Sequence, residues 1–183
     1  MKVAIMQPYF FPYIGYFSLI KHTDKFILLD TVQYIYHGWI ERNRILKPNN
    51  GWQYVKVPLL AHSRSTRIHE IQIQTESNWR RRIVAQLQHY KKFAPYYRDV
   101  IHLCECLIDS ESSIVSLNLM AMRAVLEYLN IEKQIEVFSQ MGLSIVTPTF
   151  PDEWALNICK AHGNVDEYWN PLGGKAFFDR SKY

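Results

Sequence analysis

Cysteines are scarce in this chain of 183 residues, and so are clusters of residues that bind metals. Its three cysteines cannot all pair, and the side chains of Cys104 and Cys106 diverge on a helix, which favours reduced thiols and a cytoplasmic location. No pair of histidines stands at a convincing metal-ligand spacing with cysteines or carboxylates, so we predict no metal site. A nucleophile triad is equally absent from the sequence, which leaves other residue patterns to indicate the chemistry.

Long apolar runs and a strong net charge are also missing. No run approaches the roughly 20 apolar residues that span a bilayer, so we expect no membrane span. The formal charge of +4 suits an anionic small-molecule substrate, but nucleic-acid binders usually carry far more. The basic run Arg80–Arg82 is therefore expected to be a solvated helix face. Without a linker, repeat or low-complexity tract, residues 1–183 are predicted to form a single α/β domain.

The beginning of the chain predicts a βαβ unit. Residues 2–7 form an apolar run typical of a buried strand, residues 13–22 have helical spacing, and residues 26–29 form a second apolar run. Two strands joined by one helix usually pair in parallel. We therefore expect a mostly parallel, Rossmann-like sheet, with a helical section around residues 76–130.

The later patterns are less uniform. They predict, in chain order, a functional loop over 31–50, strands over 52–57 and 67–74, helices over 76–92, 95–107 and 113–129, a strand over 135–138, a helix over 152–161 and a strand at 168–169.

The segment after the first strand is the first candidate site. Gln7 brings an amide to the carboxyl end of that strand, where open α/β sheets bind their ligands. Tyr13, Gly15 and Tyr16 then open a helix, whose free amides and tyrosine hydroxyls suit a phosphate or carboxylate. The alternative is a stiff connection with buried tyrosines.

The second candidate site begins where the second strand ends. Asp30 is expected to face the same cleft, followed by polar contacts from Gln33 and Tyr34. Trp39, Arg42, Asn43 and Arg44 then combine an aromatic platform with two guanidinium groups, which suits a phosphate attached to a ring. The alternative is a solvated basic loop with Trp39 folded onto the core. His89 and His37 are candidate general bases, although a satisfied structural histidine is the more common case.

Several of these residues match the sequence pattern of a known protein family. The pattern Gln-Pro-Tyr-Phe-x-Pro-Tyr-x-Gly-Tyr-Phe, then Asp-x-x-Gln-Tyr, then Trp-Ile-x-Arg-Asn-Arg-Ile closely resembles the WbqC-like family of bacterial polysaccharide-locus proteins. The matching residues are Gln7, Pro8, Tyr9, Pro12, Gly15, Tyr16, Asp30, Gln33, Tyr34, Trp39, Arg42, Asn43 and Arg44.

The resemblance implies a role in making surface polysaccharide such as O-antigen. The activity that we expect from it is transfer of an acyl or aminoacyl group to the amine of a nucleotide-linked amino sugar, with ATP or a nucleotide sugar as the nucleotide. In that scheme Tyr13, Tyr16, Arg42 and Arg44 hold phosphates. The other expected substrate-binding residues are Tyr9, Gly15, Gln33, Tyr34 and Trp39. Gln7 and Asn43 orient the reacting carbonyl, and Asp30 orients the amine.

A second, more distant likeness concerns the helix N-terminus. Pro12-Tyr13-Ile14-Gly15-Tyr16 stands where nucleotidyltransferases of the HIGH-motif superfamily carry Pro-x-His-x-Gly-His, but here both histidines are tyrosine. The lack of an obvious nucleophile leaves an alternative open, in which the protein is a non-catalytic module that binds a nucleotide sugar, a partner enzyme or a second copy of itself. Members of the WbqC-like family often run several dozen residues longer, so the resemblance implies that a C-terminal element found in them is lacking from these 183 residues.

Overall fold

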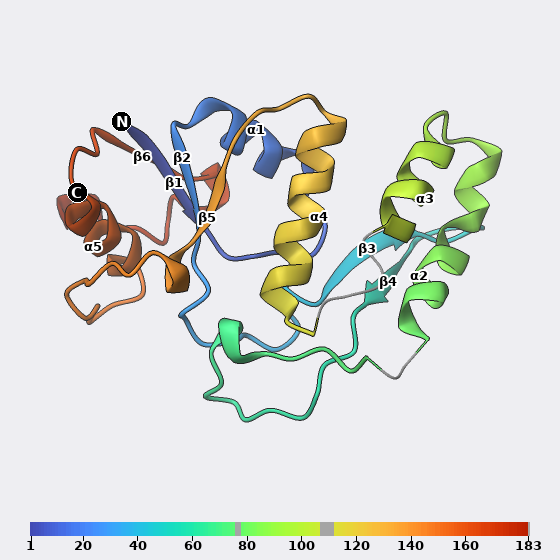
Figure 1. Cartoon of the computed structure of the whole chain (residues 1–183), viewed down its shortest axis with the longest axis horizontal. Helices are drawn as coiled ribbons and strands as arrows, with labels where there is room; N and C mark the ends of the chain where they lie inside the picture. The colour runs from blue at the N-terminus through green and yellow to red at the C-terminus, as the bar shows by residue number, and fades with distance from the viewer. Residues whose placement is uncertain (76–77, 107–111, 183) are drawn as a thin grey trace. The chain divides into compact units, whose positions relative to one another are not determined.

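The computed structural model describes residues 1–75, 78–106 and 112–182, which group into two compact units (Figure 1). The first unit consists of Met1–Gln7, Tyr13–Asp30 and Ile131–Tyr183, and the second of Pro8–Pro12 and Thr31–Asn130. Each unit is described below by itself.

A parallel sheet organises the first unit. Its strand order is β5 (Ile135–Val137), β2 (Lys25–Leu28), β1 (Lys2–Met6) and β6 (Glu167–Trp169). All three neighbouring pairs are parallel, with Ile5 of β1 opposite Ile27 of β2. The helix α1 (Ile14–His22) connects β1 to β2, so the predicted βαβ unit and the α/β fold class are confirmed.

Helices cover both faces of this sheet, which explains why its strands are continuously apolar. Val3 and Ile27 pack in one cluster with Ile158 of α5 (Glu153–His162). Phe26, the neighbour of Ile27, points the other way, and its ring centroid lies 5.9 Å from that of the buried Tyr16 on α1. Because successive strand residues alternate between faces, α1 and α5 lie on opposite sides.

The second unit contains a two-stranded antiparallel hairpin. β3 (Arg42–Leu46) pairs with β4 (Trp52–Lys56), and the turn is closed by the bond from Lys47 N to Gly51 O, at 3.0 Å. The prediction of a loop throughout residues 31–50 was therefore wrong at β3. This strand is buried on neither face, so its sequence lacks the apolar alternation that identifies a half-buried strand.

The predicted strand over 67–74 was also wrong. Ile68–Glu70 is a short 3-10 helix (η1), in which the Glu70 carboxylate accepts a bond of 2.7 Å from Arg67 N. Only isolated bridges follow, at Gln72 and Ile73. The buried isoleucines that suggested a strand serve equally well to anchor an irregular segment to the core.

Helices make up the rest of the second unit, as the sequence predicted. α2 (Trp79–Leu87) continues into the 3-10 helix η2 (Gln88–Lys92) and contacts both β4 and α3 (Tyr97–Cys106), which in turn contacts α4 (Ile114–Tyr128) (Figure 1). The predicted helix ends at 76–77 and at 107 lie outside the described residues. Short 3-10 helices in the first unit are η3 (Phe138–Gln140), η4 (Leu172–Gly174) and η5 (Arg180–Lys182). Across the described ranges, no helix has both the length and the apolar character needed to cross a membrane.

Candidate functional site

The segment Pro8–Pro12, here called the strap, belongs to the second unit. The buried amide of Asn118 donates to the carbonyl of Pro8 at 2.7 Å and to that of Ile40 at 2.9 Å. The ring of Phe10 is buried in the same unit. The two prolines of the N-terminal motif therefore bound a segment that is fixed by packing and by an internal hydrogen-bond donor.

Two further motif residues hold the strap. The Asn43 amide donates to the carbonyls of Phe10 and Phe11, at 3.0 and 2.5 Å. The carbonyl of Trp39 accepts a bond of 2.8 Å from Phe10 N. Phe11 has a φ of 45°, which is uncommon for an aromatic residue and needs such support. The donor groups of Asn43 are thus engaged with the backbone, whereas the sequence suggested contact with a reacting carbonyl.

The predicted residues of the helix N-terminus lie in the first unit. The buried Tyr16 donates its hydroxyl to the carbonyl of Gln7 at 2.6 Å, so it closes the end of β1. The Tyr13 ring lies against Gly15, where even a Cβ atom would collide with it. Tyr13 itself is 57% exposed, which leaves its hydroxyl accessible to a ligand.

Asp30 has a structural environment in the same unit. Its side chain is buried, and its carboxylate accepts bonds from the backbone N of Ser139 at 3.0 Å and from the hydroxyl of Ser139 at 2.5 Å. These bonds tie the end of β2 to η3. The predicted contact with an amine stays a prediction.

Arg42 and Arg44 lie on β3 in the second unit. The Arg42 guanidinium lies 4.1 Å from the ring centroid of Tyr54 and donates from Nε to the Gly38 carbonyl at 3.0 Å. Arg44 is exposed, and its guanidinium lies 4.3 Å from the Trp52 ring and 5.0 Å from the Trp39 ring. The predicted pairing of guanidinium groups with an aromatic platform is thus present.

Two further predicted binding residues, Gln33 and Tyr9, lie in the same unit, and their contact with a ligand stays a prediction. Gln33 is exposed and donates to the Arg64 carbonyl at 2.6 Å. Tyr9, within the strap, is half-buried.

A pocket of about 450 Å³ in the second unit brings together several titratable and charged side chains. We call it the His62 pocket. Its walls are formed by Tyr34, Tyr36, His37, Glu41, Lys56, Pro58, Leu59, His62, Gln74, Trp79 and Arg82. Both cationic side chains of this set belong to exposed residues, whereas Tyr34, Glu41 and Trp79 are buried. The pocket therefore combines a buried polar interior with positive charge at the solvent.

Glu41 is the buried charge of this pocket. Its residue is only 1% exposed, and its Oε2 atom has no hydrogen-bond partner among the described residues. Burial, together with a hydrogen bond to Glu41, holds the pKa of Tyr34 well above its usual value. The phenol therefore stays protonated and can donate a hydrogen bond at any physiological pH. The Nε atom of Arg42 lies 4.0 Å from the Glu41 carboxylate and compensates part of its charge.

His62 has the orientation of a general base. Its Nδ1 atom lies 2.8 Å from the Leu60 carbonyl, which can only accept, so Nδ1 carries the proton of the neutral ring. Nε2 then holds the free electron pair, and it has no partner among the described residues. The ring stacks on Tyr36 at 5.1 Å and meets Tyr34 edge-on at 5.0 Å. These contacts fix the imidazole in place before any ligand binds.

Sequence reasoning found part of this pocket. Tyr34 was a predicted binding residue, and His37, a candidate base, is a wall residue. Glu41 and His62 were missed, although Glu41 occupies the unspecified position of the motif Trp-Ile-x-Arg-Asn. A carboxylate directly after a buried isoleucine was the available signal. His62 lies in a polar loop with no pattern that distinguishes it from the other histidines.

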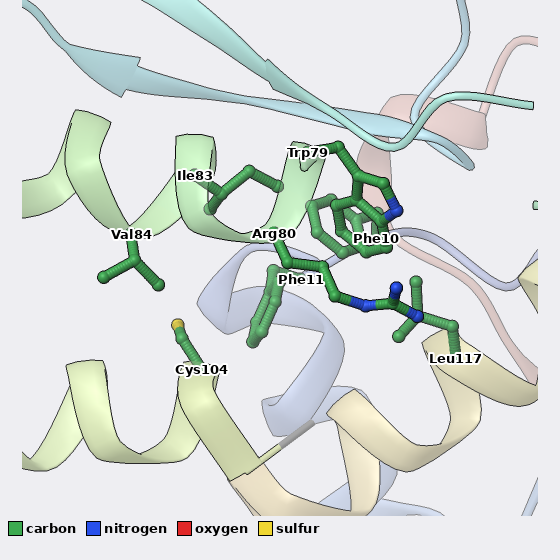
Figure 2. A pocket seen from close by; sticks show the side chains of 8 residues that line it. All are labelled: Phe10, Phe11, Trp79, Arg80, Ile83, Val84, Cys104 and Leu117. Atoms are coloured by element: carbon green, nitrogen blue, oxygen red, sulfur yellow. The ribbon is translucent and has the colours of Figure 1, made fainter. Parts of the chain in front are cut away.

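A second cavity, of about 20 Å³, lies beside α2 and α3 (Figure 2). Its walls include Phe10 and Phe11 of the strap, and Figure 2 shows the Cys104 sulfur pointing from α3 toward α2. Burial raises the pKa of the Cys104 thiol to about 11, so the thiol is protonated and unreactive at neutral pH. A cavity of this size holds no organic ligand, and the site is part of the core.

The comparisons with known proteins agree with the motifs. A profile of the WbqC-like protein family matches residues 7–183. The chain belongs to this family. An uncharacterized protein of Mycobacterium tuberculosis, Rv1507c, is 31% identical over 143 residues, which make up 73% of this chain and 58% of the relative. The chain thus spans less than two thirds of the length of that relative.

No solved structure matches this member of the WbqC-like family with significance. The likeness to HIGH-motif nucleotidyltransferases therefore stays a prediction. Within residues 1–75, 78–106 and 112–182, no group of three histidine, cysteine or acidic side chains is placed to hold a metal ion.

Proposed function

We propose that the chain transfers an acyl or aminoacyl group to the amine of a nucleotide-linked amino sugar during the synthesis of bacterial surface polysaccharide. Membership of the WbqC-like family, which is linked to polysaccharide loci, supports the pathway. The observation that carries the activity is the His62 pocket, in which an oriented imidazole, a buried carboxylate and a protonated phenol occur together.

His62 acts as the general base in this proposal. As the amine nitrogen forms its bond to the acyl carbon, Nε2 takes the proton that the nitrogen loses. The bond from that carbon to the leaving group of the activated donor breaks, and the leaving group departs with the electron pair. The Tyr34 phenol donates a hydrogen bond within the pocket, and Lys56 and Arg82 attract the phosphates of the nucleotide.

Turnover by the full chain tests this proposal. Nucleotide-linked amino sugars are incubated with coenzyme A thioesters or aminoacyl-adenylates, and the acylated sugar is measured by mass spectrometry. The His62→Gln variant keeps the size and polarity of the side chain but loses the base, so we expect turnover to fall by about 10²- to 10⁴-fold. The matched variant His22→Gln changes an exposed histidine on α1 and should retain full turnover.

Two results would contradict the assignment. Unchanged turnover in His62→Gln would remove the imidazole from the mechanism. If no donor and acceptor pair gives product while a nucleotide sugar still raises the melting temperature, the chain is a non-catalytic binding module, since ligands that bind the native state stabilise it by mass action.

A further inference from the structure

The interior of the His62 pocket has the composition of a site for an organic cation. Three rings of its wall pack against one another, with centroid separations of 5.3 Å for Tyr34 and Tyr36, 5.0 Å for Tyr34 and His62, and 5.1 Å for Tyr36 and His62. The buried indole of Trp79 forms another part of the wall. Aromatic faces carry negative potential and attract ammonium groups.

Glu41 supplies a buried carboxyl group to the same interior. The residue is 1% exposed, and Oε2 lacks a hydrogen-bond partner among the described residues, which is costly for a buried carboxylate. Tyr34 forms a hydrogen bond with this carboxylate, and the Nε atom of Arg42 lies 4.0 Å from Oε1 but donates to the Gly38 carbonyl, while another nitrogen of the same guanidinium donates to the His37 carbonyl. The geometry thus leaves Oε2 as an acceptor for a cation that enters the pocket.

We propose that the interior of the His62 pocket binds the ammonium group of the substrate, with Glu41 Oε2 as its acceptor and the aromatic wall beside it. Lys56 and Arg82 are exposed wall residues and suit an anionic group on the same molecule. The ligand class is therefore a molecule with a primary amine at one end and a phosphate at the other. This inference rests on the proposed function, because it names the part of the pocket that holds the acceptor amine. The bound ammonium first gives one proton to Glu41 Oε2, which frees the electron pair of the nitrogen, and His62 Nε2 takes the second proton as the bond to the acyl carbon forms.

A matched pair of sugar phosphates tests the ammonium site. Glucosamine 6-phosphate and glucose 6-phosphate differ only in an ammonium group that replaces a hydroxyl. Both are titrated into the full chain by calorimetry at one ionic strength. We expect the wild type to bind the amino sugar at least about tenfold more tightly, which is the size of a charge-assisted contact. The Glu41→Gln variant keeps the shape of the side chain and should bind the two sugars equally.

The matched control is Glu127→Gln, which neutralises an exposed carboxylate on α4 of the same unit and should keep the preference. Equal affinities in the wild type would overturn the ammonium site without requiring any variant to fold. Binding of neither sugar, or a preference that survives in Glu41→Gln, would also overturn it. None of these results tests the transfer activity, which is decided by the separate turnover assay with His62→Gln.

Discussion

Arg42 and Arg44 stand two positions apart on β3, yet their side chains have different surroundings. Arg42 donates to the carbonyl of Gly38 at 3.0 Å and to that of His37, and its charge faces the buried Glu41. Arg44 is exposed, and its guanidinium lies over rings, 4.3 Å from that of Trp52 and 5.0 Å from that of Trp39. Residue type and sequence position are therefore poor guides to which of the two stabilises the fold.

This difference gives a prediction for two alanine variants. Arg42→Ala leaves two carbonyls without their donor and the buried Glu41 carboxylate without a cation at 4.0 Å, so we expect a loss of about 2–4 kcal/mol in the free energy of unfolding. Arg44→Ala removes an exposed cation–π contact and should cost about 0.5–1 kcal/mol. Urea denaturation of both variants measures the two values. Equal losses would mean that the bonds of Arg42 contribute nothing beyond packing.

At the scale of single elements, the N-terminus of α5 depends on pH. The Glu153 carboxylate accepts bonds from Lys182 Nζ at 3.0 Å, from Thr149 N at 2.8 Å and from Phe150 N at 3.1 Å. The Lys182 bond, followed by the two backbone bonds, lowers the pKa of Glu153. Because the pKa is lower in the folded state, this stabilisation is complete above the ordinary pKa of glutamate, about 4.3, and is lost as the pH falls through the lowered value.

The Glu153→Gln variant tests this pH dependence. At pH 7 it should melt at a lower temperature than the wild type, because the neutral amide binds Lys182 and the backbone amides more weakly. The difference should shrink as the pH falls through the lowered pKa of Glu153, because the wild-type carboxylate is then protonated as well. Thermal melts at several pH values measure it, with Glu132→Gln as an exposed control. A difference that stays constant as the pH falls would contradict the carboxylate explanation.

The elements also show what local sequence determines. α1, α5 and the four strands of the parallel sheet were predictable because both faces of that sheet are covered, so their apolar periods are strong. β3 and the 3-10 helix at Ile68–Glu70 were not, since a hairpin with exposed faces and an anchored loop carry no diagnostic period. The His62 pocket was beyond local patterns because its walls come from three segments, around Glu41, around His62 and at Trp79.

At the scale of the whole molecule, the two units alternate along the chain. The chain leaves the first unit after Gln7, and the strap Pro8–Pro12 belongs to the second unit. The chain then returns to the first unit and leaves it a second time after Asp30. The most specific sequence motif therefore supplies structure to both units, with Tyr16 closing β1 and Asn43 holding Phe10. That dual role is invisible in sequence, where the motif reads as one ligand-binding loop. The expectation of a single domain stays a prediction.

Asn118 offers a way to test how far the two units unfold together. Its amide donates to Pro8 and Ile40, which both belong to the second unit, and it is fully buried. Asn118→Ala leaves those carbonyls unsatisfied, so we expect about 2–4 kcal/mol less protection from hydrogen exchange in the second unit. Peptides that cover β1 and β2 should keep their wild-type protection.

The control for this experiment is Asn157→Ala on α5 in the first unit, which removes a half-buried side chain whose amide donates to the Val146 carbonyl at 2.9 Å. It should leave the exchange of the second unit unchanged. An equal loss of protection in β1, β2 and α4 after Asn118→Ala would contradict separate opening and support the single cooperative domain that the composition suggests. The reason is that a local defect lowers protection everywhere only when every part must open together.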